Sequence, residues 1–421
     1  MSKNEKITNK KSTDNHYLSG KEIRAIAKAN AKVMNELEKR KYRKADESEF
    51  VTNMKDDSNI LEIDDLHTYF FTDQGVVKAV NGVSFNVPLN STVGVVGESG
   101  CGKSVTSMSV MRLLQGPQGQ IYSGSIRFKS MEYCRDEKGN PIPKKDADGK
   151  DMTDDNGNVI FETEDKVFDI AQMPIKEIHR IRGRQISMIF QEPMTSLNPV
   201  FTIGNQLDEV TFIHIPGATK EMAKKRSLEM LELVGIAMPE RVYNSYPHEL
   251  SGGMRQRVMI SMALACNPRL IIADEPTTAL DVTIQAQILD LLRDLKDKIN
   301  GSILLITHDR GVIAEMADYV VVMYAGRVIE QGTVSEIFHN PLHPYTIGLQ
   351  KSKPTMDSDS ETLFNIPGNV PNPVNMPNHC YFKERCSKCI KKCSGDYPGM
   401  VQVSPTHFVA CHLYGAEENN G

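Results

Sequence analysis

One eight-residue segment constrains the fold of this 421-residue chain more than any other feature. It fits the pattern G-x-x-x-x-G-K-[ST] in full, and it reads Gly97-Glu98-Ser99-Gly100-Cys101-Gly102-Lys103-Ser104. An apolar run at 93–97 precedes it, and a helical stretch at 104–114 follows it. A strand, a glycine-rich turn and a helix in this order begin a βα unit of a parallel sheet.

The residue types of this segment suit a phosphate group bound with magnesium. Glycines let backbone N–H groups turn inward around phosphates, and the positive end of the following helix faces the anion. Lys103 would place its charge on the β- and γ-phosphates, and Ser104 would offer a hydroxyl to Mg²⁺. We interpret Cys101 as a small filling residue. The segment therefore predicts a nucleotide site.

A second apolar run, LIIAD at 270–274, reads as a buried strand that ends in two acidic residues. Asp274 could hold the Mg²⁺ shell, and Glu275 could polarise an attacking water. Adjacent acids after an apolar run can also cap a helix, but the phosphate loop weakens that alternative. SILLIT at 302–307 is a further buried-strand candidate, whereas 61–70 and 79–87 read as strands joined by a turn at 73–75. The fold class predicted is α/β with an antiparallel β portion before it.

A third motif, Leu250-Ser251-Gly252-Gly253-Met254-Arg255-Gln256, places a Ser-Gly-Gly turn at the start of a helix. Such a turn is another anion-binding helix terminus. Because the chain already has one phosphate loop, a second phosphate-binding element suggests a site shared between two subunits.

LSGGM, placed between the phosphate loop and DEP, resembles the signature of ABC-type ATPases. The resemblance implies an ABC-type nucleotide-binding domain with a RecA-like parallel-sheet core, an antiparallel β subdomain and a helical subdomain. It also implies that two such domains close head to tail around two ATP molecules.

The resemblance assigns roles to further residues in this sequence. Gln191 resembles the Q-loop glutamine, Asp281 the D-loop aspartate and His308 the switch histidine. Phe70 lies 27 positions before Gly97, where the family stacks an aromatic ring on adenine, and Tyr69 is the alternative. Expected ATP contacts are Phe70, Gly97, Ser99, Gly100, Cys101, Gly102, Lys103, Ser104, Val105, Ser251, Gly252, Gly253 and Asp281; expected Mg²⁺ ligands are Ser104, Gln191 and Asp274; and expected catalytic residues are Glu275, His308 and Gln191.

Two segments are similar to the oligopeptide/dipeptide (and nickel) importer ATPases, namely QEPMTSLNPVFTIGNQ at 191–206 and NPLHPYTIGL at 340–349. This resemblance implies the ATPase subunit of a peptide importer at the cytoplasmic face of the membrane. Implied partners are two membrane permease subunits, a second ATPase of the related F type and an extracytoplasmic peptide-binding protein. The membrane subunits of the family dock after Gln191. Nickel or another small solute as cargo, and a non-transport ABC ATPase, remain alternatives.

Five of the eight cysteines lie between positions 380 and 411. The spacing Cys380-x5-Cys386-x6-Cys393-x17-Cys411 is similar to that of D-type peptide permease subunits, where a [4Fe–4S] cluster can be bound. Cys389 departs from the family pattern and creates a C-x2-C pair, which also suits zinc. An iron–sulfur cluster with Cys389 as a possible replacement ligand, a zinc site and free thiols are the three interpretations.

Charge and composition set apart a basic N-terminal extension at 1–58 and an acidic, turn-rich insertion at 130–166. The resemblance then implies an ABC ATPase domain at 59–335, which contains the insertion, and a small cysteine-rich C-terminal domain of the oligopeptide-permease type at 336–421. Residues 1–44 hold 13 Lys and Arg against 5 Asp and Glu, and Ser19 with Glu22 resembles a capping box. We expect a partly helical or disordered segment there. The net charge of −5 argues against nucleic-acid binding. No apolar run approaches the roughly 20 residues of a membrane span, and the charged N-terminus predicts no signal peptide.

Overall fold

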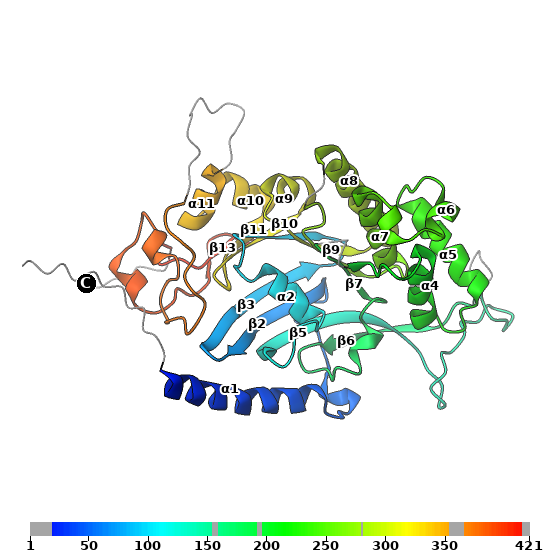
Figure 1. Ribbon diagram of the computed structural model, residues 1–421, viewed down its shortest axis with the longest axis horizontal. Helices are drawn as coiled ribbons and strands as arrows, with labels where there is room; N and C mark the ends of the chain where they lie inside the picture. The colour runs from blue at the N-terminus through cyan, green and yellow to red at the C-terminus, as the bar shows by residue number, and fades with distance from the viewer. Residues whose placement is uncertain (1–18, 154–158, 192–195, 279–280, 353–365, 415–421) are drawn as a thin grey trace, which may run out of the picture.

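The computed structural model describes residues 19–153, 159–191, 196–278, 281–352 and 366–414. Two sheets lie at its centre, with helices above and to one side of them and one long helix, α1, along the lower edge (Figure 1). Within the described residues, no helix combines the length and apolar character needed to cross a bilayer.

The larger sheet has eight strands in the order β12-β13-β11-β10-β4-β9-β8-β7. Its central strands β10, β4, β9, β8 and β7 run parallel to one another, as the βα unit predicts. Their short apolar segments are almost wholly buried. The bounds are β4 Thr92–Val96, β7 Ile186–Ile189, β8 Leu270–Asp274, β9 Ser302–Ile306, β10 Tyr319–Tyr324, β11 Arg327–Thr333, β12 Val401–Gln402 and β13 Phe408–Val409.

The smaller sheet is antiparallel and has the strand order β1-β6-β5-β2-β3. Its bounds are β1 Val51–Thr52, β2 Asn59–Thr72, β3 Gly75–Pro88, β5 Gly119–Tyr133 and β6 Thr163–Asp169. The two strands expected at 61–70 and 79–87 are therefore present and longer than the sequence pattern indicated. Side chains of both sheets, such as Phe128 and Ile306, form one core between them.

The acidic insertion begins and ends inside this antiparallel sheet. β5 continues to Tyr133 and β6 starts at Thr163, so the two ends of the segment pair with each other. Isolated bridges such as Arg135↔Pro141 and Lys145↔Asp151 then form short hairpin turns beyond the sheet. The first and last residues of the insertion are therefore strands of the smaller sheet, and the described residues beyond them form turns.

Helices cover the larger sheet, and several of them gather at one end of it (Figure 1). The helix after the phosphate loop, α2, runs only from Lys103 to Val110, shorter than the 104–114 expected, and Arg112 adopts a positive φ of 53°. The other helices are α4 Ile203–His214, α5 Lys220–Leu233, α6 Pro239–Tyr243, α7 Gly252–Leu264, α8 Val282–Ile299 and α9 Arg310–Met316, with 3-10 turns η1 Glu47–Glu49, η2 Ile178–Arg180 and η3 Pro247–Glu249.

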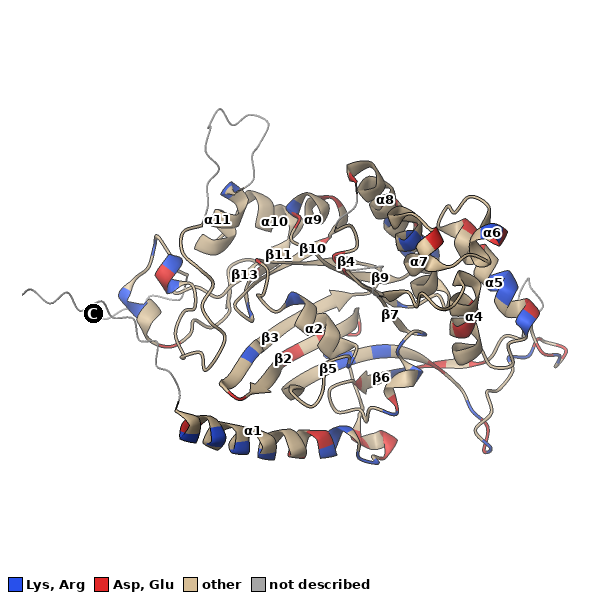
Figure 2. Cartoon of the chain, viewed as in Figure 1, with Lys and Arg blue, Asp and Glu red and all other residues tan. Residues whose placement is uncertain are grey.

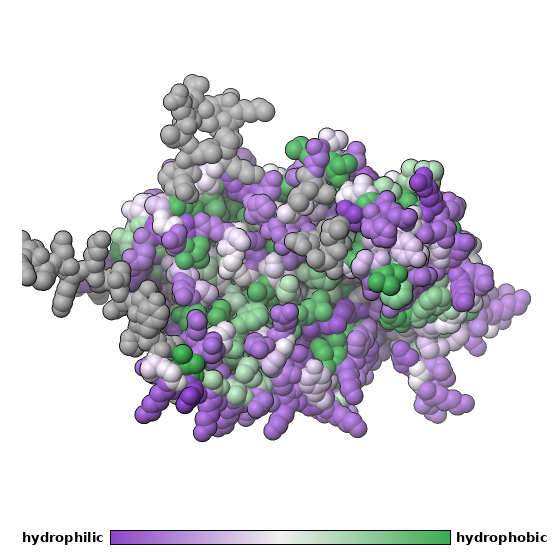
Figure 3. All heavy atoms as spheres, viewed as in Figure 1, coloured by the Kyte–Doolittle hydropathy of each residue, from purple (hydrophilic) through white to green (hydrophobic). Residues whose placement is uncertain are grey.

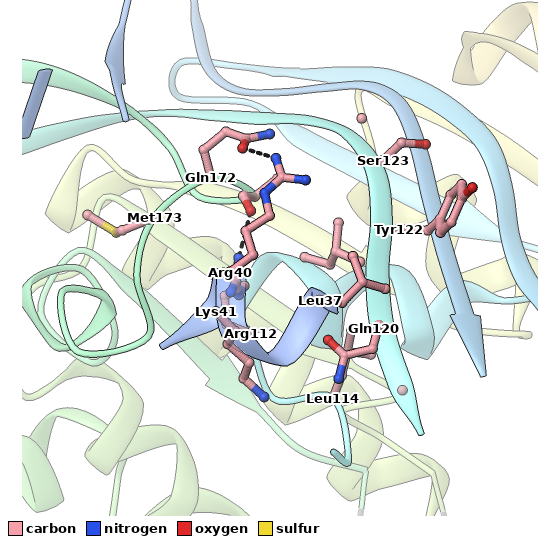
Figure 4. A pocket seen from close by; sticks show the side chains of 14 residues that line it. Leu37, Arg40, Lys41, Arg112, Leu114, Gln120, Tyr122, Ser123, Gln172 and Met173 are labelled. Atoms are coloured by element: carbon pink, nitrogen blue, oxygen red, sulfur yellow. Dashed lines mark hydrogen bonds between the residues drawn. The ribbon is translucent and has the colours of Figure 1, made fainter. Parts of the chain in front are cut away.

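The N-terminal helix α1, Gly20–Lys41, begins with the capping box expected at Ser19 and Glu22. It lies against the smaller sheet, where Asn30 Nδ2 donates to Thr72 O at 2.7 Å. Many of its lysines and arginines lie along the edge turned away from the sheet, which is also the hydrophilic lower edge of the molecule (Figures 2 and 3). At its end Arg40 points to Gln172, close to Arg112 (Figure 4). The helix is thus docked on the protein through one face.

The C-terminal segment packs on the larger sheet. It contains α10 Val334–His339, α11 Pro344–Lys351, η4 Lys383–Arg385 and η5 Lys391–Ser394, and β13 pairs with β11. Tyr345, Tyr381 and Phe382 belong to the same apolar cluster as residues of β4, β8, β9 and α7. The cysteine-containing segment therefore shares its core with the rest of the molecule and is not packed apart from it.

Candidate functional site

The phosphate loop connects β4 to α2, and its glycines are required by close backbone approaches. A Cβ at Gly97 would lie 2.2 Å from Met323 O, and a Cβ at Gly102 would lie 2.4 Å from Ala79 O. Gly102 also has a φ of 102°, a conformation that residues with side chains rarely adopt. These glycines hold the loop against β3 and β10, and the loop leads directly into the N-terminus of α2.

Lys103 and Ser104, the first two residues of α2, lie beside the expected metal ligand. Lys103 is buried, and its Nζ donates to Gly97 O at 2.8 Å and to Glu98 O at 3.2 Å. Ser104 Oγ donates to Asp274 Oδ1 at 3.0 Å. Burial raises the pKa of Asp274 to about 6, and the charge of Glu275 acts in the same direction. A hydroxyl and a carboxylate at this point are oxygen ligands of the kind that Mg²⁺ prefers.

Glu275 is the centre of a second group of contacts. Its carboxylate accepts hydrogen bonds from Gln191 Nε2 at 2.9 Å and from Thr278 Oγ1 at 2.8 Å, and it lies 3.2 Å from His308 Nδ1. Burial raises the pKa of Glu275, but the hydrogen bonds from Thr278 and His308 outweigh it and leave the pKa below its usual value. The backbone of Glu275 has a φ of 49°, which is uncommon for a residue with a side chain.

The structure thus brings together the three residues expected in catalysis, Glu275 from its motif and His308 and Gln191 from the resemblance. Thr278 was missed, because a threonine in TTALD has no distinguishing sequence signal. An ionised carboxylate that is oriented by three neighbours is suited to accept a proton from water.

The Ser-Gly-Gly motif opens a helix, as expected, and it is exposed. Ser251 caps α7 by accepting a hydrogen bond from Met254 N at 3.3 Å. Gly252 is so open that an added Cβ would meet no atom within 4 Å, and Gly253 packs against Ile284 of α8. Asp281 caps α8 by accepting from Thr283 N at 2.9 Å. Within the part of the chain that the structure describes, no hydrogen bond joins these residues to the phosphate loop.

The two aromatic candidates for adenine differ in their surroundings. Phe70 is half-buried on β2, and its ring lies against Gly119, where an added Cβ would be 2.8 Å from Cε1. Tyr69 is buried, stacks on Tyr122 at 5.0 Å and donates to Asn81 Oδ1 at 2.9 Å. Tyr69 therefore already has partners in the fold, which leaves Phe70 as the better candidate.

The residues expected to dock membrane subunits begin at Gln191, but 192–195 lie outside the described residues. Large apolar side chains are exposed shortly after them and on α4, namely Val200, Phe201, Phe212 and Ile213. Val200 exposes 74 % of its surface and Ile213 exposes 64 %. These residues provide an apolar surface next to the Q-loop segment.

Two residues to which the sequence assigned no role at the nucleotide site contact the phosphate loop from the C-terminal segment, one of them within the NPLHPYTIGL segment. Arg385 forms a two-pronged ion pair with Glu98, with Nη1–Oε2 and Nη2–Oε1 distances of 2.7 and 2.9 Å. Tyr345 Oη accepts a hydrogen bond from Glu98 N at 2.8 Å. They are separated from Glu98 by 287 and 247 residues, so only the folded chain reveals them.

The cysteines expected as metal ligands lie near one another. Burial raises the pKa of Cys380 to about 11, and the neighbouring thiols Cys393, Cys411 and Cys386 act in the same direction. Cys389 is exposed and lies beside Cys393 and Cys386. None of the cysteines is in a disulfide. Over the described ranges, no group of three or more His, Cys, Asp or Glu side chains has the arrangement of a metal site.

Comparisons with known proteins agree with this geometry. Residues 80–278 match the ABC transporter family, and residues 329–393 match the oligopeptide/dipeptide transporter C-terminal region. The dimeric post-hydrolysis state of the ATP-binding cassette MJ0796 bound to ADP and Pi has a TM-score of 0.51 at 24 % identity, covering 65 % of this chain and 98 % of that one. This structural likeness supports the fold.

Curated relatives are more similar in sequence. The oligopeptide transport ATP-binding protein AppD of Bacillus subtilis (strain 168) is 46 % identical over 86 % of this chain and 100 % of its own length. OppD of the same organism, also an oligopeptide transport ATP-binding protein, is 48 % identical over 85 % of this chain and 89 % of its own. The dipeptide transport ATP-binding protein DppD of Bacillus subtilis (strain 168) is 44 % identical over 84 % of this chain and 94 % of its own length. The chain therefore belongs to the family of ATP-binding proteins of oligopeptide and dipeptide ABC transporters.

Proposed function

We propose that this chain is the ATP-hydrolysing subunit that drives uptake of oligopeptides or dipeptides through separate membrane subunits. The observation that carries the proposal is the set of contacts on Glu275 from Gln191, Thr278 and His308, next to the Ser104–Asp274 pair. The peptide class of the cargo is supported by what the curated relatives are named for.

Each side chain then has a defined task in hydrolysis. Ser104, Asp274 and Gln191 would hold Mg²⁺, which would supply positive charge to offset that of the phosphates. Lys103 adds charge on the phosphates, and Phe70 would stack on adenine. Glu275 accepts a proton from the attacking water because its lowered pKa keeps it ionised, while His308 and Gln191 keep its carboxylate oriented.

The exposed Ser251–Gly253 end of α7 would complete the ATP site of a second ATPase chain. A head-to-tail pair would therefore bury two ATP molecules, each between a phosphate loop and a Ser-Gly-Gly motif. We propose a related F-type ATPase as this partner, two membrane permease subunits docked near the apolar side chains of α4, and an extracytoplasmic peptide-binding protein. In this assembly the chain lies at the cytoplasmic face of the membrane.

The assembly can be tested by affinity purification of Glu275→Gln from native membranes with ATP present, followed by mass spectrometry. The expected result is recovery of two multi-span proteins and a second ABC ATPase. Recovery of soluble partners alone would overturn the transport role. Uptake of a labelled pentapeptide, a labelled dipeptide and radioactive nickel in cells lacking the gene would then define the cargo, and loss of nickel uptake alone would overturn the peptide assignment.

We also propose that Cys380, Cys386, Cys393 and Cys411 bind a [4Fe–4S] cluster with a structural role. Four thiols that influence one another electrostatically are a donor set that suits such a cluster, because it is held by four thiolates. Bound as thiolates, they would tie the turns around η4 and η5 to the segment after β13 that holds Cys411. Cys389 is exposed and would stay outside this set.

Metal analysis of anaerobically purified protein decides between the alternatives. About four irons and four sulfides per chain are expected, with loss in Cys393→Ser and retention in Cys389→Ser. One zinc per chain, or loss of iron in Cys389→Ser and not in Cys411→Ser, would contradict the proposed ligand set.

A further inference from the structure

A buried arginine from the C-terminal segment reaches the phosphate loop. Arg385 ends the short η4 turn, and only 5 % of its side chain is exposed. Its guanidinium forms the two-pronged ion pair with Glu98, the second residue of the loop. Pairs of this geometry are among the stronger ion pairs, because two parallel N–H···O bonds fix both side chains.

The guanidinium of Arg385 is held on every side. Nε donates to Pro367 O at 3.0 Å, Nη2 donates to Ile366 O at 3.4 Å, and Nη1 also donates to Tyr324 Oη at 3.3 Å. The two contacts with Glu98 bring the number of donor contacts to five, which is the number of N–H groups that a guanidinium carries. The rings of Tyr324 and Phe382 lie 5.7 and 5.8 Å from it. Arg385 is therefore fixed before any ligand arrives.

The position of Glu98 explains why such a partner matters. Glu98 lies between Gly97 and Ser99, in a loop whose backbone and Lys103 are built for an anion. A free carboxylate there would repel the phosphates of a nucleotide, since like charges oppose each other most strongly where water is partly excluded. Arg385 cancels this charge and also restrains the loop.

A second contact from the same segment fixes the backbone at this position. Tyr345, the third residue of His343-Pro344-Tyr345 at the start of α11, is fully buried and accepts the Glu98 N–H at 2.8 Å. Lys103 Nζ binds the Glu98 carbonyl at 3.2 Å. The side chain, N–H and carbonyl of Glu98 are thus each restrained, two of them by the C-terminal segment.

We propose that Arg385 is a positioning residue of the ATP site, which neutralises Glu98 and, with Tyr345, makes the affinity for nucleoside triphosphate depend on the C-terminal segment. This inference rests on the proposed ATPase function. It gives the C-terminal segment, in which Cys386 directly follows Arg385, a direct physical connection to the phosphate loop.

The test compares Arg385→Met, Glu98→Gln and the double variant, with binding of Mg-ATP and Mg-ADP measured by calorimetry and ATP hydrolysis measured in the assembled transporter. Arg385→Met should weaken ATP binding about 10-fold and ADP binding less, and it should raise KM for ATP while kcat changes less than twofold. Glu98→Gln in the same chain should restore ATP affinity to within about threefold of the wild type, because no carboxylate is then left unpaired. Arg269→Met is the matched control and should bind ATP normally. Arg269 directly precedes β8, at the end away from Asp274, and this substitution removes its ion pair with Asp165.

The outcomes separate the inference from the function on which it rests. If the wild-type protein binds neither nucleotide, the proposed ATPase function fails. If the wild type binds ATP and Arg385→Met binds it equally well, the inference alone fails. Equal weakening of ATP and ADP binding without rescue by Glu98→Gln would also overturn it, because a general folding defect does not depend on the charge at position 98. Tyr345→Phe provides a milder variant, expected to weaken ATP binding about threefold through loss of one hydrogen bond.

Discussion

The phosphate-loop end and the signature end of this protein are constructed in opposite ways. At the phosphate loop, Lys103 and Asp274 are buried, and Glu275 has three polar partners. At the signature end, Ser251 and Gly252 are exposed, and among the described residues the hydrogen bonds of Ser251 stay within its own helix. The phosphate-loop end, called the organised end below, is held in place by residues of its own chain. The signature end, called the open end, offers an exposed helix N-terminus, as expected for a surface that another chain completes.

The two ends also differ in which other parts of the chain contact and support them. The C-terminal segment contacts the phosphate loop through Arg385 and Tyr345, so a region that follows the ATPase domain in sequence stabilises that end. At the signature end, Gln256 of α7 donates to Pro276 O at 2.6 Å, which connects that helix to the turn after Glu275. The signature helix is therefore attached to the turn after Glu275. The phosphate loop, in contrast, is also restrained by two residues of the C-terminal segment.

The largest expected effect comes from replacing the base at the organised end. Glu275→Gln keeps the acceptor for Thr278 and the shape of the side chain, but an amide does not take a proton from water. ATP turnover should fall by about 10³-fold, while ATP affinity stays within about twofold. Phosphate release by the assembled transporter and calorimetry on the isolated chain measure the two quantities. Glu315→Gln, at an exposed ion pair with Arg293, is the control, and normal turnover in Glu275→Gln would remove Glu275 from its role.

A change at the open end should separate hydrolysis from binding. Gly252→Asp adds a carboxylate where an added Cβ meets nothing, so the fold tolerates it, yet the new charge would oppose the phosphates of a nucleotide held by a partner chain. Hydrolysis by the assembled transporter should drop by about 10²-fold, with unchanged ATP binding to the isolated chain.

The chain provides a closely matched control for this substitution. Gly20 follows a capping serine, Ser19, at the start of α1, just as Gly252 follows Ser251 at the start of α7, and it is equally open. Gly20→Asp should leave both binding and hydrolysis unchanged. If Gly252→Asp weakened ATP binding to the isolated chain as much as hydrolysis, the two ends would not be separate half-sites.

The organised end could largely be predicted from the sequence, because local patterns specify it. The glycine loop, each of the two buried strands and the acidic pair after the second strand are each formed by a short uninterrupted stretch of sequence. The structure also places Gln191 and His308 beside Glu275, as the resemblance to the family implied. The Arg385–Glu98 pair could not be predicted, because any arginine among the many in the sequence could have been the partner. Only tertiary packing brings two residues 287 positions apart into a buried ion pair.

The docking of α1 shows another limit of sequence patterns. Its capping box and apolar spacing predict a helix, which is present, but a docked helix and a solvated helix share the same spacing. The contact of Asn30 with Thr72 O decides the matter, and an asparagine carries no such signal on its own. The same holds for the C-terminal segment, where Tyr345, Tyr381 and Phe382 join the main core while Leu342, Val409 and Cys411 form a small cluster of their own.

The smallest expected effect concerns the C-terminal segment, which contacts the phosphate loop through Tyr345 and Arg385. His343 caps α11, with Nδ1 accepting from Tyr345 N at 3.0 Å, so this ring must stay neutral. Burial lowers its pKa to about 3 from 6.5, although Glu330 accepts a hydrogen bond from the His343 backbone and also pairs with His407. Between these pH values the unfolded chain binds a proton that the folded chain does not. The stability contributed by neutral His343 is therefore complete above pH 6.5 and is lost as the pH falls.

His343→Asn keeps a capping acceptor but does not titrate in this range. Between pH 7.5 and 5.5 the wild type should lose about 1 kcal/mol more unfolding free energy than the variant, as measured by urea denaturation at both pH values. His339→Asn, an exposed histidine at the end of α10, should behave like the wild type. ATP affinity should be measured at the same two pH values and should decline more in the wild type than in His343→Asn. The reason is that His343 holds the backbone N–H of Tyr345, whose hydroxyl contacts Glu98 of the phosphate loop. An identical pH dependence of stability in the wild type and His343→Asn would show that this cap does not link the C-terminal segment to the organised end.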